Sequence, residues 1–387
     1  MIRTPSRPAT TGELMVMPPL GSMTGGPGLY NRIDHATPSR SGPFQQAVLV
    51  KITTSDGITG WGECHAPAAP RVHKTVIEDM LAPVVVGQDA RDVEPLWDRM
   101  YSTQRVRGYS SGFYTEAIAG VDLALWDILG KHAGLPLSRL LGGRYRDRIP
   151  TYTGVGGASM EALKENAQRA MEQGYGAVKM GLSKGPGTRD LARVAAVVDV
   201  VKGRGQLLLD SLGAYKLHEA TVIGRELDRM GSIGWWEDVL MPEDTSNYPK
   251  LADALDVPIV AGEMLSNRFQ FRDLFSQKAV DIVNPDVCRA GGITECRKIA
   301  ILADAAAVLW SPHVSTGTAP YVSASVHLAA STPNCVIIEG GDKLAGPMGN
   351  VLLQQPLAFQ PGFAIPSDRP GLGVEFNEKE LAKITVG

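Results

Sequence analysis

The sequence has few of the residues that mark special protein classes, and these shortages exclude several functions. It holds four cysteines among 387 residues, and none of them belongs to a CxxC pair. Neither a disulfide framework nor a zinc knuckle is indicated, and a reducing cytoplasm is the expected location. No apolar run approaches the roughly 20 residues that a membrane span needs, so no membrane partner is expected.

The chain also lacks an excess of either charge. Its 38 basic and 41 acidic residues give a formal net charge of −3, and nothing in that balance indicates nucleic acid as a partner. The apolar segment Leu14 to Met17 is too short for the core of a signal peptide. With 44% hydrophobic and 20% charged residues, the composition is that of an ordinary soluble globular protein.

The first part of the chain predicts an α+β unit covering residues 1–135. Residues 1–28 are rich in Pro, Gly, Ser and Thr, which predicts loop. Alternating residues then predict a hairpin of strands 46–54 and 58–63, and helical apolar spacing follows at 72–86 and 114–132. Strands followed by helices are typical of an α+β arrangement, here a capping domain.

The remainder predicts a (β/α)8-type barrel, an α/β fold, over residues 136–355. Short apolar strands alternate there with amphipathic helices, which indicates parallel βα units. The predicted strands are 149–155, 177–180, 206–210, 233–237, 258–262, 281–284, 308–311 and 336–339. Eight units favour a closed barrel over an open sheet. The Pro- and Gly-rich segment 356–387 is predicted to return to the capping domain.

One ionisable residue stands at or just after the end of seven successive predicted strands. Their separations of 31, 27, 26, 23, 27 and 26 residues are each close to one βα unit. In a barrel this periodicity brings all seven side chains to the carboxyl-terminal rim, where active sites of the fold are built. A single strand-end acid would more often cap a helix. The seven are Lys179, Asp210, Glu237, Glu263, Asp286, His313 and Glu339.

The residue types suggest different chemical roles for these seven side chains. Asp210, Glu237 and Glu263 fall on three consecutive strands, where their mutual repulsion favours a hard divalent cation such as Mg²⁺. Asp286 and His313 follow on the next two strands, so that the carboxylate can orient the imidazole as a general base. Lys179 and Glu339 flank this set and are suited to charge that develops on a carboxylate substrate.

This order of residues resembles the mandelate racemase subgroup of the enolase superfamily over nearly the whole chain. The local contexts agree: Ala-Val-Lys-Met, Trp-Trp-Glu-Asp, Ala-Gly-Glu, Asn-Pro-Asp before Gly291-Gly292, Ser-Pro-His and Ile-Ile-Glu. The resemblance implies that Asp210, Glu237 and Glu263 bind Mg²⁺, and that His313 is a base paired with Asp286. It further implies that Glu339 hydrogen-bonds the substrate carboxylate, that the reaction passes through an ene-diolate, and that the protein is a homo-oligomer, a dimer or an octamer.

Three departures from the family pattern bear on the reaction. The second lysine of the racemase Lys-x-Lys motif is replaced by Gly181, which disfavours racemisation unless Lys179 acts as the second base. Leu212 stands two residues after Asp210, where the family often has a polar residue. Asp238-Val239 replaces the usual Glu-Pro after the fourth strand and leaves the ligand Glu237 intact.

A single base, Mg²⁺ and a carboxylate anchor fit β-elimination of water from a sugar acid best. An epimerase or racemase using Lys179, or a cycloisomerase, is the nearest alternative, and a metal-binding scaffold without catalysis is the second. Specificity is expected from the capping loops 19–30 and 63–74, and the second of these contains His65 and Arg71. The sequence does not name the sugar acid.

Overall fold

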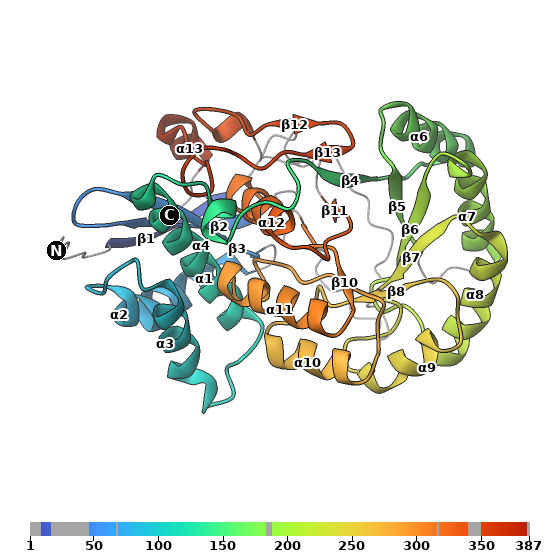
Figure 1. Cartoon of the computed structure of the whole chain (residues 1–387), viewed down its shortest axis with the longest axis horizontal. Helices are drawn as coiled ribbons and strands as arrows, with labels where there is room; N and C mark the ends of the chain where they lie inside the picture. The colour runs from blue at the N-terminus through green and yellow to red at the C-terminus, as the bar shows by residue number, and fades with distance from the viewer. Residues whose placement is uncertain are drawn as a thin grey trace.

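The chain folds into a capping unit and a barrel that pack against each other (Figure 1). The computed structural model describes residues 9–16, 46–66, 69–182, 188–315, 317–339 and 350–384. Within these ranges no helix combines the length and apolar character that crossing a bilayer requires. The predicted capping loop 19–30 lies outside the described residues.

The capping unit contains a three-stranded antiparallel sheet of β1 (Ala9–Val16), β2 (Gln46–Thr53) and β3 (Thr59–Cys64), in that order. The prediction of loop throughout residues 1–28 is therefore wrong for β1, which pairs with β2 from Ala9↔Thr53 to Val16↔Gln46. Pairing with β1 gives β2 a neighbour on both sides, and an unpaired edge is a liability that folds avoid. Such long-range pairing overrides a local composition that favours loop.

The helices of the capping unit lie against this sheet. α1 (Pro70–Thr75), the π-helical turn η1 (Val76–Leu81) and α2 (Ala82–Val85) together form the helical stretch that the sequence predicted, and they are followed by α3 (Val93–Arg105) and α4 (Phe113–Ala133). α4 approaches β3 so closely that a Cβ at Gly62 would lie 1.9 Å from the Gly120 carbonyl oxygen. Glycine is thus required at this contact.

Eight parallel strands form the barrel, which confirms the predicted fold. They are β4 (Ile149–Gly154), β5 (Ala177–Gly181), β6 (Gln206–Asp210), β7 (Ile233–Glu237), β8 (Ile259–Ala261), β9 (Ile282–Val283), β10 (Leu309–Trp310) and β11 (Ile338–Glu339). Consecutive strands pair from β4 to β10, β11 pairs with β4, and the bridge Trp310↔Cys335 joins β10 to the segment before β11. The ring of strands is therefore closed.

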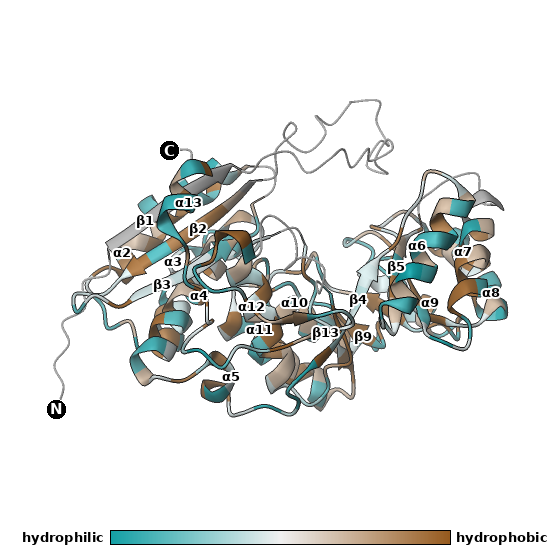
Figure 2. Ribbon diagram, turned by 90° about the horizontal axis from the view of Figure 1, so that it is seen from above, coloured by the Kyte–Doolittle hydropathy of each residue, from teal (hydrophilic) through white to brown (hydrophobic). Residues whose placement is uncertain are grey.

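Helices surround the barrel, and buried side chains fill it. The helices are α6 (Met160–Glu172), α7 (Thr188–Val201), α8 (Leu217–Met230), α9 (Tyr248–Ala252), α10 (Arg268–Ser276), α11 (Ile293–Ala305) and α12 (Ala319–Ser331). In α6 the buried residues are Leu163, Ala167 and Ala170, and much of the rest of the helix is hydrophilic (Figure 2). The interior contains a hydrophobic cluster with a residue from each of six strands: Tyr152, Ala177, Leu208, Trp235, Val260 and Ile282.

The carboxyl-terminal segment contacts both units. β12 (Phe359–Gln360) and β13 (Phe363–Ala364) form a short hairpin, and β13 pairs antiparallel with β4 of the barrel. The chain then reaches the capping unit, where the Phe376 ring lies 4.8 Å from that of Trp61 and Lys51 pairs with Glu378 at 2.6 Å. Glu378 begins α13 (Glu378–Ile384).

Candidate active site

The seven predicted side chains meet at the carboxyl-terminal rim of the barrel. Lys179, Asp210, Glu237 and Glu339 lie within β5, β6, β7 and β11, whereas Glu263, Asp286 and His313 lie two or three residues beyond β8, β9 and β10. Ion pairs link the set through Lys179 on one flank and His313 on the other. The regular spacing in sequence is therefore a spatial cluster.

Three of these carboxylates could hold a metal ion. Asp210, Glu237 and Glu263 each offer one oxygen, and these oxygens lie within 4.8 Å of one another. Burial is the main factor that raises the pKa of Glu237, to about 8, and Asp210 and Glu263 raise it further while Lys179 lowers it. A hard divalent cation would relieve this crowding of buried acids, and carboxylate oxygens are the ligands it prefers. The donor set therefore fits Mg²⁺ chemically.

Lys179 lies among the predicted metal ligands. Its Nζ is 3.1 Å from Asp210 Oδ2, 3.0 Å from both carboxylate oxygens of Glu237 and 3.9 Å from Glu339 Oε1. It also lies 5.6 Å from the ring centre of Tyr152. Burial disfavours its charge, but the nearby carboxylates outweigh burial and hold its pKa well above the usual value. The carboxylates that could hold a metal ion therefore also favour the charged form of Lys179.

His313 and Asp286 form the predicted pair. His313 Nδ1 lies 2.7 Å from Asp286 Oδ2, and its Nε2 lies 2.9 Å from Glu263 Oε2 and 3.6 Å from Glu339 Oε2. Burial alone would raise the pKa of Asp286, yet the hydrogen bond and charge of His313 bring it down to about 2. An ionised Asp286 accepts the Nδ1 hydrogen, so Nε2 is the nitrogen that faces the metal ligands.

Several side chains that support this cluster were missed by sequence reasoning. The Tyr321 hydroxyl donates to Asp286 Oδ2, and backbone N–H groups of Cys288 and Arg289 donate to its Oδ1 at 2.8 and 3.1 Å. Asn284 Nδ2 donates to Glu237 at 2.9 Å, and Trp235 Nε1 donates to it at 3.1 Å. Asn284 and Trp235 lie inside the recognised motifs, which was a usable signal, but Tyr321 carried none.

Two carboxylates of the capping unit bind the amino-terminal ends of α11 and α12. These helices follow β9 and β10, the strands that lead to the Asp286–His313 pair, which we call the dyad. Glu63, in β3, accepts the backbone N–H of Thr318 at 2.8 Å, at the start of α12. Asp122, in α4, accepts the Thr294 N–H at 3.0 Å and its hydroxyl at 2.6 Å, at the start of α11. Acidic groups stabilise helix amino termini. The capping unit therefore fixes the two helices next to Asp286 and His313.

The departures from the racemase pattern have a clear geometry. A Cβ at Gly181 would meet only the Asp210 carbonyl oxygen at 3.9 Å, so crowding does not require glycine there. Leu212 and Asp238 have positive φ angles of 46° and 43°, directly beyond two of the predicted ligands. Left-handed backbone at non-glycine residues is strained and is often found at functional sites.

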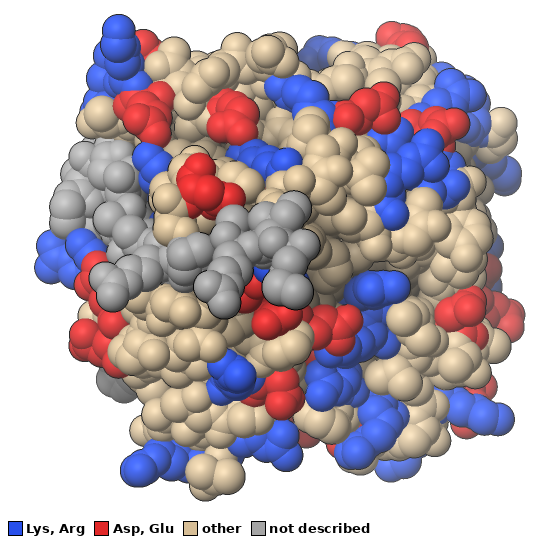
Figure 3. All heavy atoms as spheres, turned by 60° about the vertical axis from the view of Figure 1, so that its left-hand side comes forward, with Lys and Arg blue, Asp and Glu red and all other residues tan. Residues whose placement is uncertain are grey.

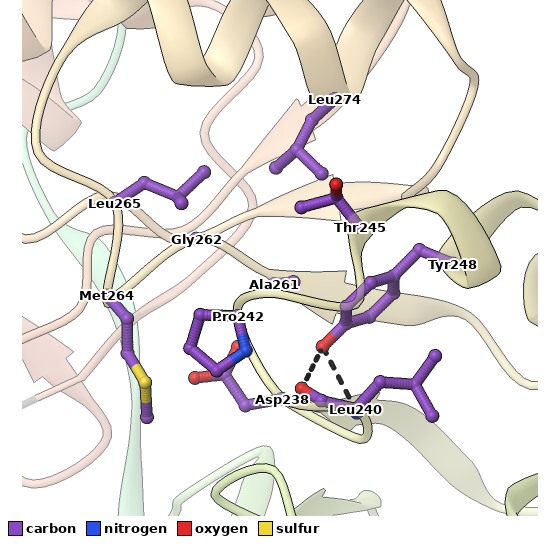
Figure 4. A pocket seen from close by; sticks show the side chains of 10 residues that line it. All are labelled: Asp238, Leu240, Pro242, Thr245, Tyr248, Ala261, Gly262, Met264, Leu265 and Leu274. Carbon is purple, nitrogen blue, oxygen red and sulfur yellow. Dashed lines mark hydrogen bonds between the residues drawn. The ribbon is translucent and has the colours of Figure 1, made fainter. Parts of the chain in front are cut away.

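A hollow beside these turns is not the candidate site. It is lined mainly by apolar side chains from the segments after β7 and β8, and none of the seven rim residues is among them (Figure 4). Asp238 lines it next to Pro242, while the Tyr248 hydroxyl bonds to the backbone of Leu240. The rim cluster is the place where ionisable groups converge.

The predicted loop 63–74 contains two buried histidines, His65 and His73. His65 is 5% exposed, whereas Arg71 is exposed.

On the face drawn in Figure 3, basic and acidic residues are mixed in the part of the chain that the structure describes. Such a surface gives no support for binding a polyanion.

Comparison with known proteins agrees with the fold. The family model for the mandelate racemase / muconate lactonizing enzyme N-terminal domain matches residues 33–142, and the enolase C-terminal domain-like model matches residues 162–380. A D-galactarolactone cycloisomerase of Agrobacterium fabrum is 33% identical over 92% of this chain and 96% of its own length. A D-galactonate dehydratase of Variovorax paradoxus is 33% identical over 86% of this chain and 90% of its own length.

A solved structure shows the same fold with a metal ion. An L-talarate dehydratase of a Polaromonas species, complexed with Mg and L-glucarate, is 27% identical with a TM-score of 0.83, and the match covers 100% of this chain and 98% of that one. Together with the two domain matches, this confirms the resemblance found in the sequence. The chain belongs to the mandelate racemase / muconate lactonizing enzyme group of the enolase superfamily.

Proposed function

We propose that this protein is a Mg²⁺-dependent hydro-lyase that removes the proton next to the carboxylate of a sugar acid and eliminates water. The observation that carries the proposal is the buried His313–Asp286 pair, whose Nε2 faces the three-carboxylate cluster. Gly181 stands where the racemase pattern has its second lysine, and the Lys179 side chain pairs with Asp210 and Glu237. One available base suits elimination better than racemisation.

The roles of the residues follow from their contacts. Asp286 holds the Nδ1 hydrogen of His313, which leaves the Nε2 lone pair to take the α-proton. Lys179 and Glu339 bind and orient the substrate carboxylate. Once protonated, His313 Nε2 returns its proton to a β-hydroxyl on the same face, and that group leaves as water. The 2,3-enol that remains becomes a 2-oxo-3-deoxy acid.

Asp210, Glu237 and Glu263 would hold the Mg²⁺ ion. When bound, the ion supplies positive charge that stabilises the ene-diolate formed by the substrate. The dehydratase with bound Mg and the carboxylate chemistry of the site both support this choice of metal. Asn284 and Trp235 keep Glu237 in place through their hydrogen bonds to its two oxygens.

A cycloisomerase is the second candidate, and the Agrobacterium relative favours it. The same Nε2 would remove the α-proton of a sugar-acid lactone or anhydro acid, and a ring oxygen rather than hydroxide would leave from the β-carbon. The residues needed are the same, so the leaving group separates the two reactions. An epimerase is disfavoured because Gly181 stands where the racemase pattern has its second lysine.

The proposal is tested with a library of mono- and diacid sugars and their lactones, each incubated with the Mg²⁺-loaded protein. Proton NMR in deuterated water would report both the 2-oxo-3-deoxy product and loss of the α-proton signal. Dehydration of an open-chain acid supports the hydro-lyase, and ring opening of a lactone supports the cycloisomerase. Neither product nor α-proton exchange with any acid would leave the catalytically inactive scaffold as the correct account.

A further inference from the structure

A histidine and an arginine that the proposed reaction does not use lie together near the dyad. His65 follows β3 in the capping unit, and Arg289 lies three residues after Asp286. The Arg289 Nη2 atom is 2.8 Å from His65 Nε2. A guanidinium can only donate, so Nε2 is the acceptor and the ring hydrogen of His65 is on Nδ1.

Each of the two side chains keeps a donor that is not used. Nδ1 of His65 and Nε of Arg289 are buried and have no hydrogen-bond partner among the described residues. In the same part of the chain no carboxylate forms an ion pair with the Arg289 side chain. Buried polar groups are nearly always satisfied, so unsatisfied ones need an explanation, and a bound ligand is one.

The pair is on the dyad side of the rim. Burial lowers the pKa of His65 to about 3, and the charges of Asp286, Arg289 and His313 all act on it. His65 is therefore a neutral donor close to the dyad. Lys179, in contrast, is on β5, four strands from the β9 strand that leads to Arg289, which is the opposite side of an eight-stranded barrel.

Contacts on both sides of His65 fix its position. Two residues before it, Glu63 binds the start of α12 through Thr318. Further along the chain, in α1, His73 Nε2 lies 2.8 Å from Glu116 Oε2, and its Nδ1 lies 3.2 Å from the Ala69 carbonyl oxygen. A donor that is held in place before a ligand arrives loses little conformational freedom when it binds.

We propose that His65 and Arg289 form a subsite for a second carboxylate, so that the enzyme prefers sugar diacids or their lactones over monoacids. The proposal rests on the proposed function, with the first carboxylate at Lys179 and Glu339. The pair offers only donors, and a carboxylate is an acceptor-only group that takes several hydrogen bonds. A hydroxyl fits less well because its own hydrogen would find no acceptor on this pair.

The competing explanation is that Arg289 only balances nearby negative charge. Asp286 and Glu263 both act on its guanidinium. If balance were its whole role, replacing Arg289 would weaken monoacids and diacids alike, because both need the same dyad and metal ligands. The ratio of the two affinities therefore separates the explanations.

The test is calorimetric binding of galactonate and galactarate, a monoacid and a diacid with the same stereocentres, to the Mg²⁺-loaded protein. The gluconate and glucarate pair is measured in parallel. A His313→Asn background keeps bound acids from being consumed, and binding needs no turnover. Turnover is measured separately in wild type: if wild type turns over no acid, the proposed function is refuted, while diacid-selective binding would still support the subsite.

At least one diacid should bind about tenfold or more tightly than its monoacid. Arg289→Gln should weaken diacid binding by about 10- to 100-fold, the range for a hydrogen bond to a charged group, and monoacid binding by less than about threefold. His65→Phe, which keeps the ring but removes the Nδ1 donor, should reduce the preference in the same direction. Arg71→Gln removes the same charge from an exposed position of the loop and should leave it unchanged.

Two results would overturn the proposal. One is that no diacid in either pair binds more tightly than its monoacid. The other is that a preference exists and its ratio is unchanged in both Arg289→Gln and His65→Phe, including the case in which a variant weakens both acids equally. Thermal unfolding of each variant verifies that a change in affinity is not a loss of fold.

Discussion

At the residue scale, the site consists of carboxylates that the barrel brings close together and of cationic side chains that balance their negative charge. Asp210, Glu237 and Glu263 come from adjacent strands, and Lys179 and His313 pair with them from the two flanks. The periodicity of the strands was enough to predict these residues. The support from Tyr321 was not predictable, because its hydroxyl reaches Asp286 only through the docking of α12.

Replacing Glu263 by Gln should weaken Mg²⁺ binding and abolish turnover. The variant keeps the size of the side chain but loses one of three anionic ligands. Substituting residues outside the ligand shell of a metal site already costs about 10- to 100-fold in affinity or activity, so a ligand itself should cost at least as much. Calorimetric titration with Mg²⁺ measures this, with Glu243→Gln, at an exposed position, as the matched control. Unchanged Mg²⁺ affinity would remove Glu263 from the ligand set.

Asp286→Asn and Tyr321→Phe should slow turnover in graded order. The first removes the charge that orients His313 and raises its basicity, and general-base catalysis is worth about 10²- to 10⁴-fold. The second removes only one donor to Asp286, so its effect should be smaller. Steady-state kinetics should show losses mainly in kcat. An equally large rise in KM with kcat unchanged would mean that the dyad binds substrate rather than reacting with it.

At the element scale, the capping unit and the barrel are joined where helices begin. Asp122 and Glu63 bind the amino termini of α11 and α12, and a Cβ at Gly292 would lie 2.4 Å from Asp122 Oδ2. The Gly291-Gly292 motif was recognised in the sequence, but its packing reason required the structure. The strand β1 was also missed, and so was the π-helical form of η1 within the predicted helix 72–86, since pairing and packing decide both rather than local pattern.

The buried Asp122 should make stability depend on pH. Burial raises its pKa from 3.8 to about 7, so its contribution is fully present below about pH 4 and is lost as pH rises through about 7. Each pH unit in this window corresponds to at most about 1.4 kcal/mol. The thermal unfolding temperature of Asp122→Asn should therefore rise relative to that of wild type as the pH increases from 5 to 8. Parallel pH curves for the two proteins would show that Asp122 does not titrate in this range.

At the scale of the whole molecule, the fold class was readable from the sequence. Eight βα units after a strand-and-helix unit predicted a capped barrel, and the closed ring from β4 to β11 confirms it. The boundaries at residues 135 and 355 and the homo-oligomer stay predictions. The antiparallel hairpin of β12 and β13 was not predicted, because residues 359–364 lie in a Pro- and Gly-rich segment and show no pattern typical of a strand.

The proposed second-carboxylate subsite was not readable from the sequence, because it depends on how the capping unit meets the barrel. The contact of His65 with Arg289 joins residues 224 positions apart. No local spacing could reveal it. The ionisable residues of the rim, in contrast, recur once in each βα unit, so their spacing is visible in the sequence.

The central claim is that His313 is the one base that removes the α-proton. The most direct test follows α-proton exchange by NMR in deuterated water, comparing wild type with His313→Asn, both loaded with Mg²⁺ and given a substrate found in the library. Wild type should lose the α-proton signal and, if His313 is the one base, the variant should retain it entirely. Exchange that continues in His313→Asn would contradict the claim and would make Lys179 a competent base, with an epimerase as the better account.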